Sequence, residues 1–369
     1  MPRSEDDFAR ALLRWHAVHG RHDLPWQREP SPYHVWVSEI MLQQTQVATV
    51  IPFYTRFMAR FPDVATLAAA PLDAVLHQWS GLGYYARARN LKRAAARIAN
   101  EHGGILPASL EALCALPGIG RSTAGAILSL AFGQRVPILD GNVKRVLTRY
   151  HGLAGWVEDA AVLRALWTLA EAHMPAERAG DYTQAIMDLG ATVCVRRGPA
   201  CPRCPLATAC RARREGRQHE IPAPRPKRVL PVKYTRFLVA QRPDGAVFLE
   251  RRPPAGIWGG LWSFPELGPA EDPRARLTAL GLGAARALRD LAPFSHGFTH
   301  FRLEIAPLYA AVDGSAATLM DSAERVWYKV AAPRAIGLAA PVARLLEALR
   351  AQASSPAGGR SYGAQAPED

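Results

Sequence analysis

Two acidic residues stand in contexts that would give their carboxyl groups opposite properties. Glu39 lies in the segment 33–46, where helical spacing surrounds it with apolar side chains. Burial favours the neutral acid and raises its pKa, so Glu39 is a candidate general acid, although a buried Glu can also be paired with Arg or backbone. Asp140 precedes a helix predicted over residues 143–150 and can serve simply as its N-cap. Because a helix N-terminus stabilises a carboxylate, we expect Asp140 to stay ionised.

Brought together, a protonated acid and a carboxylate would suit the hydrolysis of an N-glycosidic bond. The acid would protonate a departing purine at N7, and the anion would stabilise an oxocarbenium-like sugar until water adds. The sequence does not place Glu39 and Asp140 in one pocket, so this pairing is a hypothesis.

Four of the five cysteines fall within 17 residues, a density that indicates metal binding rather than disulfides in a cytosolic chain. Zinc is the general interpretation of four close cysteines, but two symmetric Cys-x2-Cys knuckles are absent. Four thiolates also suit a 4Fe–4S cluster. We expect the fifth, Cys114, to be a small core residue. The candidate ligands are Cys194, Cys201, Cys204 and Cys210.

The segment Leu116-Pro-Gly-Ile-Gly-Arg-Ser-Thr-Ala124 lies between two predicted helices. Gly118 and Gly120 permit a tight turn and leave backbone N–H groups that could bind a phosphate, although such a turn is often only a turn. The net charge is +13, and residues 1–230 carry 29 Lys and Arg against 19 Asp and Glu. This excess favours a nucleic-acid partner over mere solubility.

The elements that must position these residues divide the chain into parts. Residues 1–214 read as a helical domain, with helices predicted near 8–18 and over 67–78, 87–100, 110–116, 123–132, 143–150 and 162–172. Ser31-Pro32 marks a further helix start. Residues 215–231 form a basic, proline-rich linker. Residues 232–351 read as an α+β domain, with strands over 235–241, 246–251 and 301–311 and helices near 273–280 and 341–350. Residues 352–369 have the composition of a disordered tail.

No apolar run is long enough to span a membrane, and the N-terminus lacks the features of a signal or transit peptide. We therefore expect a cytoplasmic, nucleoid-associated protein.

Together these motifs resemble the helix–hairpin–helix DNA glycosylase superfamily with an iron–sulfur cluster. The hairpin, Asp140 about 20 residues beyond it and the cysteine spacing carry the resemblance. Within the superfamily, the segments 38–46, 81–87 and 138–144 resemble the adenine-specific members. The resemblance implies a mainly α N-terminal glycosylase domain with a 4Fe–4S cluster on the four cysteines. It also implies a monomer that removes adenine paired with 8-oxoguanine or guanine in double-stranded DNA.

By motif position, the resemblance assigns roles to individual residues. Glu39 would be the general acid, with Asp140 as the cation stabiliser and Asn142 assisting it. Superfamily lyases carry a Lys where this chain has Ser122, which predicts a monofunctional glycosylase that leaves an abasic site. The remaining expected contacts are Gln44 and Thr45 within the DNA helix, Tyr84 as a wedge beside the oxidised guanine, Gly118, Gly120 and Ser122 in the DNA-binding hairpin, and Trp26 in the adenine pocket.

In the second domain, residues 254–266 resemble the start of a Nudix-type fold. The continuation, residues 267–277, lacks the Glu-rich helix that would hold magnesium, so we expect a reader of the oxidised base without hydrolase activity. Phe298-Thr299-His300 resembles the Phe-Ser-His loop that contacts 8-oxoguanine. Threonine keeps the hydroxyl group and adds a methyl group. The alternative is that Phe298 and His300 are core residues of a sheet.

Two rival functions remain at this point. An oxidised-pyrimidine glycosylase-lyase could carry the same cluster, but Ser122 and the second domain argue against it. A DNA-binding protein or scaffold that has lost catalysis is the other, and the presence of both Glu39 and Asp140 weighs against it.

Overall fold

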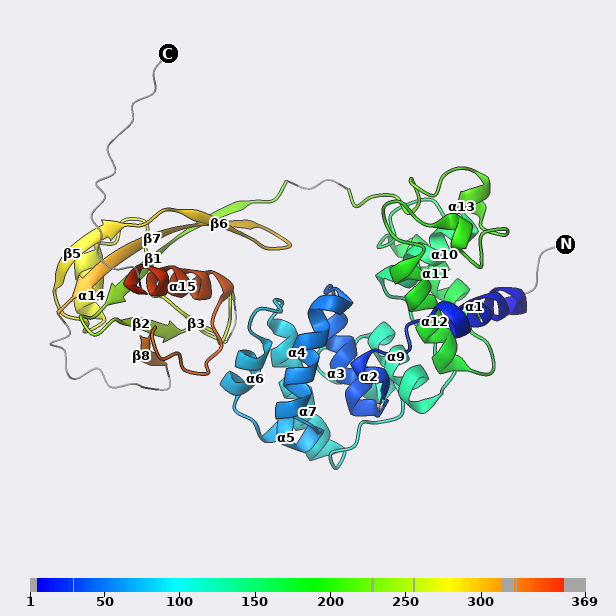
Figure 1. The fold of residues 1–369 in the computed structure, drawn as a ribbon, viewed down its shortest axis with the longest axis horizontal. Helices are drawn as coiled ribbons and strands as arrows, with labels where there is room; N and C mark the ends of the chain where they lie inside the picture. Colours follow the sequence, from blue (N-terminus) through cyan, green and yellow to red (C-terminus); the bar gives the residue numbers. More distant parts are fainter. Residues whose placement is uncertain are drawn as a thin grey trace, which may run out of the picture. The chain divides into compact units, whose positions relative to one another are not determined.

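The computed structural model describes residues 5–28, 30–226, 229–254, 256–313, 322 and 324–354. The chain forms two compact units, drawn in Figure 1: residues 1–78 with 84–228, and residues 229–369 with 79–83. Most of the predicted tail lies outside the described residues, whereas its first three residues continue a helix that ends at Ser354.

The first unit is helical (Figure 1). Its helices are α1 Glu5–His19, α2 Pro25–Arg28, α3 Pro32–Leu42, α4 Val47–Arg60, α5 Val64–Ala69, α6 Leu72–Trp79, α7 Ala86–Glu101, α8 Leu110–Cys114, α9 Arg121–Phe132, α10 Gly141–His151, α11 Ala160–His173, α12 Ala179–Thr192 and α13 Arg211–Arg214, with a short 3₁₀ turn at Cys201–Arg203.

The helix predicted near residues 8–18 is confirmed as α1, although Val18 near its C-terminal end is exposed. Phe8 and Leu12 of α1 are almost fully buried, and they belong to one core cluster with Leu147 of α10 and Leu189 of α12. Burial of each such side chain contributes about 1.5–3 kcal/mol, so this cluster fixes the position of α10, whose N-terminus carries Asp140. Ser31 caps α3 as predicted, accepting a hydrogen bond from the His34 N–H.

Two features of the helical unit differ from the prediction. The single helix expected over residues 67–78 is two helices, α5 and α6, because Pro71 disfavours a helical conformation at Ala70, whose ψ is 142°. Cys114 is exposed at the end of α8 and is not a core residue.

The second unit contains a mixed sheet whose core follows the order β3-β2-β1-β7-β5. The long strands β1 and β7 are parallel neighbours, paired from Val232↔Arg302 to Gln241↔Ala311. The three predicted strands are confirmed as β1, β2 and β7. The strands are β1 Val232–Gln241, β2 Ala246–Arg251, β3 Trp262–Ser263, β4 Glu266–Leu267, β5 Ala285–Asp290, β6 Phe294–Gly297, β7 Arg302–Val312 and β8 Arg325–Lys329.

Two helices accompany this sheet, α14 Pro273–Ala279 and α15 Ala340–Ser354, as the sequence predicts. Leu277 of α14 is fully buried in a cluster with Phe248 of β2 and Leu308 of β7. The hairpin between β6 and β7 turns at residues 298–301. In the part of the chain that the structure describes, no helix has the length and apolar character needed to cross a membrane.

Candidate active site

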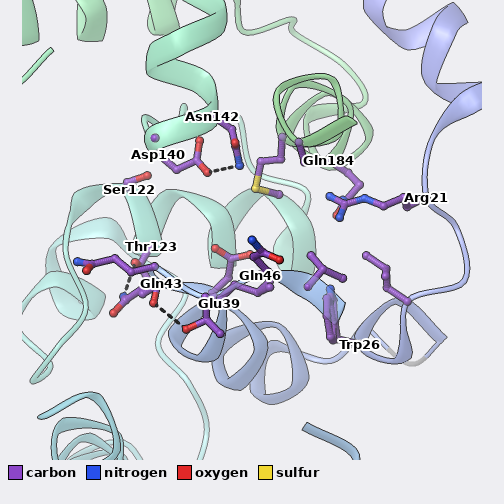
Figure 2. Close-up of a pocket in the computed structure, with 18 of the residues that line it drawn as sticks. Arg21, Trp26, Glu39, Gln43, Gln46, Ser122, Thr123, Asp140, Asn142 and Gln184 are labelled. Carbon is purple, nitrogen blue, oxygen red and sulfur yellow. Dashed lines mark hydrogen bonds between the residues drawn. The ribbon is translucent and has the colours of Figure 1, made fainter. Parts of the chain in front are cut away.

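A cavity of about 850 Å³ opens in the helical unit (Figure 2). Its lining comes from α2, α3, the loop after α3, the start of α9, the start of α10 and α12. The volume lies in the range of pockets that enclose small organic molecules. The cavity brings together the predicted residues Trp26, Glu39, Gln44, Thr45, Ser122, Asp140 and Asn142.

Glu39 reaches this cavity from α3, on a helix that is otherwise almost wholly buried. Its neighbours Ser38 and Ile40 are 1% and 3% exposed, so Glu39 keeps contact with solvent only where it faces a cavity. Burial, followed by the negative charge of Asp140, raises the pKa of the Glu39 carboxyl group to about 8. Glu39 therefore carries a proton at neutral pH, as the sequence predicts.

Asp140 is the N-cap of α10 and accepts a 2.7 Å hydrogen bond from the Val143 N–H. Its other carboxylate oxygen accepts from the Asn142 amide at 3.1 Å, as Figure 2 shows. Burial raises the pKa of Asp140, which the sequence did not indicate, although the hydrogen bonds from Val143 and Asn142 and the charge of Arg145 oppose this rise. The hydrogen bonds from Val143 and Asn142 favour the carboxylate form of Asp140, whereas burial in the cavity wall disfavours it.

Arg145 connects Asn142, the residue that donates to Asp140, to the cysteine loop. Its guanidinium donates to Asn142 Oδ1 and to the Gly190 carbonyl, both at 2.7 Å, and to the Cys194 carbonyl at 2.6 Å. A Cβ atom on Gly190 would lie 2.5 Å from Asn142 Cβ, so only glycine allows α12 to approach Asn142 this closely. Asn142 is therefore fixed on two sides while it holds Asp140.

The predicted hairpin joins α8 to α9, and Gly118 adopts a φ of +82°, a conformation suited to glycine. Gly120 is the N-cap of α9. Neither glycine lines the cavity, whereas Ser122 does. The Ser122 hydroxyl accepts a 3.0 Å hydrogen bond from the Leu139 N–H, which ties the hairpin helix to the residue before Asp140.

Gln44 and Tyr84 are exposed loop residues with unusual backbone conformations. Their φ angles are +59° and +50°, a region that non-glycine residues rarely adopt and that is often retained at functional sites. Buried Arg87 joins the two loops, because its guanidinium lies 5.3 Å from the Tyr84 ring centroid and donates to the Gln43 carbonyl and the Thr45 hydroxyl. The role of Arg87 was not foreseen from the sequence.

The cavity also contains residues that sequence reasoning missed. Arg21 and Gln184 line it, and both donate to the fully buried carboxylate of Asp188, Arg21 through its Nε at 2.8 Å and Gln184 through its amide at 2.8 Å. Trp26 lines the same region, with its ring packed edge-on against Tyr54 at 5.3 Å. The i,i+4 spacing of Gln184 and Asp188 was the only available signal, and it is weak.

The four clustered cysteines line one small cavity of about 30 Å³ beside Arg149. Burial, together with the neighbouring cysteines, raises the pKa of the Cys204 thiol to about 12. Among the described residues, no three His, Cys, Asp or Glu side chains are grouped closely enough to hold a single metal ion. In a cluster each thiolate binds a different iron, so its ligands need not converge on one point.

In the second unit, Phe298, Thr299 and His300 form the tip of the β6–β7 hairpin. Phe298 stacks on Phe301 with ring centroids 4.3 Å apart and also contacts Trp258. Thr299 and His300 are exposed, so His300 is not a core residue of the sheet. The aromatic contacts fix the loop while its polar side chains face solvent.

Comparison with known families agrees with this architecture. Residues 37–172 match the HhH-GPD superfamily of base excision DNA repair proteins, and residues 236–348 match the NUDIX domain. A thermostable thymine-DNA glycosylase of known structure is 29% identical, with a TM-score of 0.53 over 57% of this chain and 97% of its own. An endonuclease III trapped on DNA shares the fold, with 23% identity and a TM-score of 0.50 over 58% of this chain and 99% of its own. The fold and the site thus define a helix–hairpin–helix glycosylase of base excision repair.

Similarity to curated relatives narrows this class. An adenine DNA glycosylase of Buchnera aphidicola (subspecies Acyrthosiphon pisum) is 38% identical over 92% of this chain and 97% of its own length. The human adenine DNA glycosylase is 37% identical over 83% of this chain and 67% of its own length. The chain belongs to the adenine DNA glycosylase family, enzymes that hydrolyse an N-glycosyl bond to release adenine from DNA.

Proposed function

We propose that this enzyme removes adenine paired with 8-oxoguanine, or with guanine, and that Glu39 and Asp140 carry out the chemistry. The observation that carries the proposal is that both carboxyl groups line one cavity while their surroundings differ. Glu39 has a pKa near 8, whereas Asp140 accepts hydrogen bonds from two donors that hold its anion. Two carboxyl groups with distinct environments are the expected arrangement for acid and stabiliser.

In this mechanism the adenosine leaves the DNA stack and enters the cavity. Glu39 donates its proton to adenine N7, which makes the base a neutral leaving group as the N-glycosidic bond breaks. Asp140 stabilises the positive charge that develops on the sugar, and Asn142 keeps its carboxylate in place. Water then adds to the anomeric carbon and its surplus proton returns to a carboxylate. Arg21 and Gln184, both fixed by Asp188, are suited to contact the edge of the base.

The Thr299-His300 tip supports recognition of the oxidised base by the second unit. Its two polar side chains are exposed on a turn that stacked aromatic rings hold, an arrangement suited to contacting a partner surface. Threonine retains the hydroxyl group that a hydrogen bond to 8-oxoguanine would use.

A single-turnover assay tests the proposed substrate. We expect adenine release from 8-oxoguanine:adenine and guanine:adenine duplexes, with none from adenine:thymine or from thymine glycol. Because Ser122 has no amine, and its hydroxyl accepts from Leu139, the product should be an abasic site without a borohydride-trapped adduct at catalytic rates. Efficient trapping, or release from thymine glycol instead, would contradict the proposal.

We further propose that Cys194, Cys201, Cys204 and Cys210 bind a 4Fe–4S cluster with a structural role. Four thiols lining one cavity fit such a group, and binding would supply the free energy needed to ionise the buried Cys204 thiol. The carbonyl groups of Cys194 and Val195 accept hydrogen bonds from Arg145 and Arg149. By ordering the cysteine loop, the bound group would hold Arg145 in the position from which it contacts Asn142.

The absorption spectrum tests this cluster. We expect the purified protein to absorb in the visible region as iron–sulfur proteins do, with four iron atoms per chain. Cys204→Ser should lose this absorption and lower the thermal midpoint by several degrees, because the loop would lose a ligand. The matched variant Cys114→Ser, at an exposed residue, should keep both. A colourless protein with one zinc per chain would show that the zinc alternative is correct.

A further inference from the structure

Arg87 lies in the first turn of α7 and is only 8% exposed, an uncommon position for a charged side chain. Burial lowers the pKa of its guanidinium to about 10, so the group still carries its charge at neutral pH. A buried cation is stable only when hydrogen bonds replace the water that it has lost. The partners of Arg87 therefore indicate which parts of the site it holds together.

The first partners are at the end of the helix that carries Glu39. Arg87 Nη1 donates to the carbonyl oxygens of Ile40 and Met41, at 3.0 and 2.7 Å. The same nitrogen donates to the Gln43 carbonyl, just beyond the helix, at 2.6 Å. Carbonyl groups in the last turn of a helix lack partners within it, and a cation there also interacts favourably with the helix dipole. Arg87 thus caps α3 at Ile40, the residue that directly follows Glu39.

A further partner of Arg87 is the residue expected to wedge beside the oxidised guanine. The guanidinium carbon lies 5.3 Å from the centroid of the Tyr84 ring, within the range of a cation–π interaction. Tyr84 is 49% exposed, so its ring can contact a bound duplex. Arg87 Nη2 also donates to the Thr45 hydroxyl at 3.2 Å. One guanidinium group therefore contacts both an exposed aromatic ring and the helix of the general acid.

We propose that Arg87 is a positioning residue through which contact of Tyr84 with the base opposite adenine stabilises the active position of Glu39. This inference rests on the proposed function, in which Glu39 is the acid, and on the expected contact of Tyr84 with 8-oxoguanine. A Tyr84 ring held against that base is fixed, and it keeps the guanidinium in the geometry that caps α3. Because a displacement of about 1 Å can lower a rate about 100-fold, the preference for 8-oxoguanine over guanine then depends on Arg87.

The test compares single-turnover rates on 8-oxoguanine:adenine and guanine:adenine duplexes at saturating enzyme, so that affinity does not enter. Arg87→Lys keeps the charge but loses the planar group that reaches both the carbonyls and the ring. It should lower the ratio of the two rates at least about 5-fold, the lower end of typical coupling between two sites. Tyr84→Leu should also lower this ratio. The double variant should lower it no further than the larger of the single changes, because both remove the same coupling.

Arg149→Lys is the matched control, because Arg149 is also buried and donates to backbone carbonyls, those of Ile221 and Val195. It should leave the ratio of the two rates unchanged. Thr45→Val is a milder second variant for the case that Arg87→Lys folds poorly, as measured by circular dichroism and the thermal midpoint. It removes one acceptor and keeps the guanidinium, and it should lower the ratio in the same direction.

Equal losses of rate on both duplexes in Arg87→Lys, with an independent further loss in the double variant, would overturn the proposal, because Arg87 would then act only on the stability of α3. A ratio that Tyr84→Leu leaves unchanged would overturn it at its premise, the contact of Tyr84 with the opposite base. Failure of the proposed function looks different, since the wild-type enzyme would then release no adenine from either duplex.

Discussion

Glu39→Gln is expected to lower the single-turnover rate of adenine release by at least about 100-fold, because loss of a general acid typically costs a factor of 10² to 10⁴. Glutamine has nearly the same shape and can occupy the same position on α3, but it has no proton to donate at N7. Affinity for the mispair duplex should stay within about 3-fold of the wild-type value, which corresponds to less than 1 kcal/mol. A normal cleavage rate would show that the acid is another group.

Glu250→Gln provides a matched control for this substitution. Burial raises the pKa of Glu250 as it does that of Glu39, but Glu250 lies on β2 of the second unit. The variant should release adenine at the wild-type rate. A shared loss in both variants would indicate a general effect of removing a buried acid rather than proton donation.

The pH dependence of wild-type cleavage follows from the same carboxyl group. With a pKa near 8, Glu39 is protonated at pH 7 and ionises above pH 8, so the rate should fall as pH rises through 8. The free energy of unfolding should also fall as the pH rises. The folded state holds a proton that the unfolded state releases near pH 4.5, so ionisation removes stability between about pH 4.5 and 8, by up to about 5 kcal/mol. Glu39→Gln should lack this pH-dependent loss.

The two catalytic candidates could be predicted from sequence because local patterns define their environments. Glu39 lies within an apolar helical run, and Asp140 stands where a helix begins, so burial of one and capping by the other follow from neighbours within a few residues. The cysteine spacing is equally local. In the helical unit the predicted helix limits agree with the structure to within about three residues except where Pro71 divides one run, whereas α4 and α12 were not predicted.

The positions of Arg21 and Gln184 in the cavity could not be predicted, because packing between distant segments of the chain places them there. Arg21 and Asp188 are 167 residues apart, and only the docking of α1 and α12 in one core brings them together. The rise in the pKa of Asp140 could not be predicted either. A sequence shows the helix N-terminus that lowers the pKa, but not the cavity wall whose desolvation outweighs it. Short strands such as β3 and β8 are defined by their pairing with β2 and not by a pattern of their own.

Asp140→Asn is the second substitution for which we expect a large effect, a decrease of about 100- to 1,000-fold in the cleavage rate. This range is typical when one electrostatic stabiliser of a transition state is removed. Asparagine is as good an N-cap as aspartate, so its carbonyl oxygen should still accept from the Val143 N–H and α10 should remain intact. The variant therefore removes the negative charge beside the sugar without removing the cap. Circular dichroism and the thermal midpoint should confirm that the fold is unchanged.

Asp159→Asn is the matched control, because Asp159 caps α11 by accepting from the Ala161 and Val162 N–H groups and does not line the catalytic cavity. It should leave the rate unchanged.

Removal of the Asp140 charge should also lower the pKa of Glu39, since that charge raises it, and the alkaline limb of any residual activity should move to lower pH. An Asp140→Asn enzyme with full activity would mean that the sugar cation is stabilised elsewhere. A large loss of rate with an unmoved alkaline limb would mean that the two carboxyl groups do not interact in the complex with DNA.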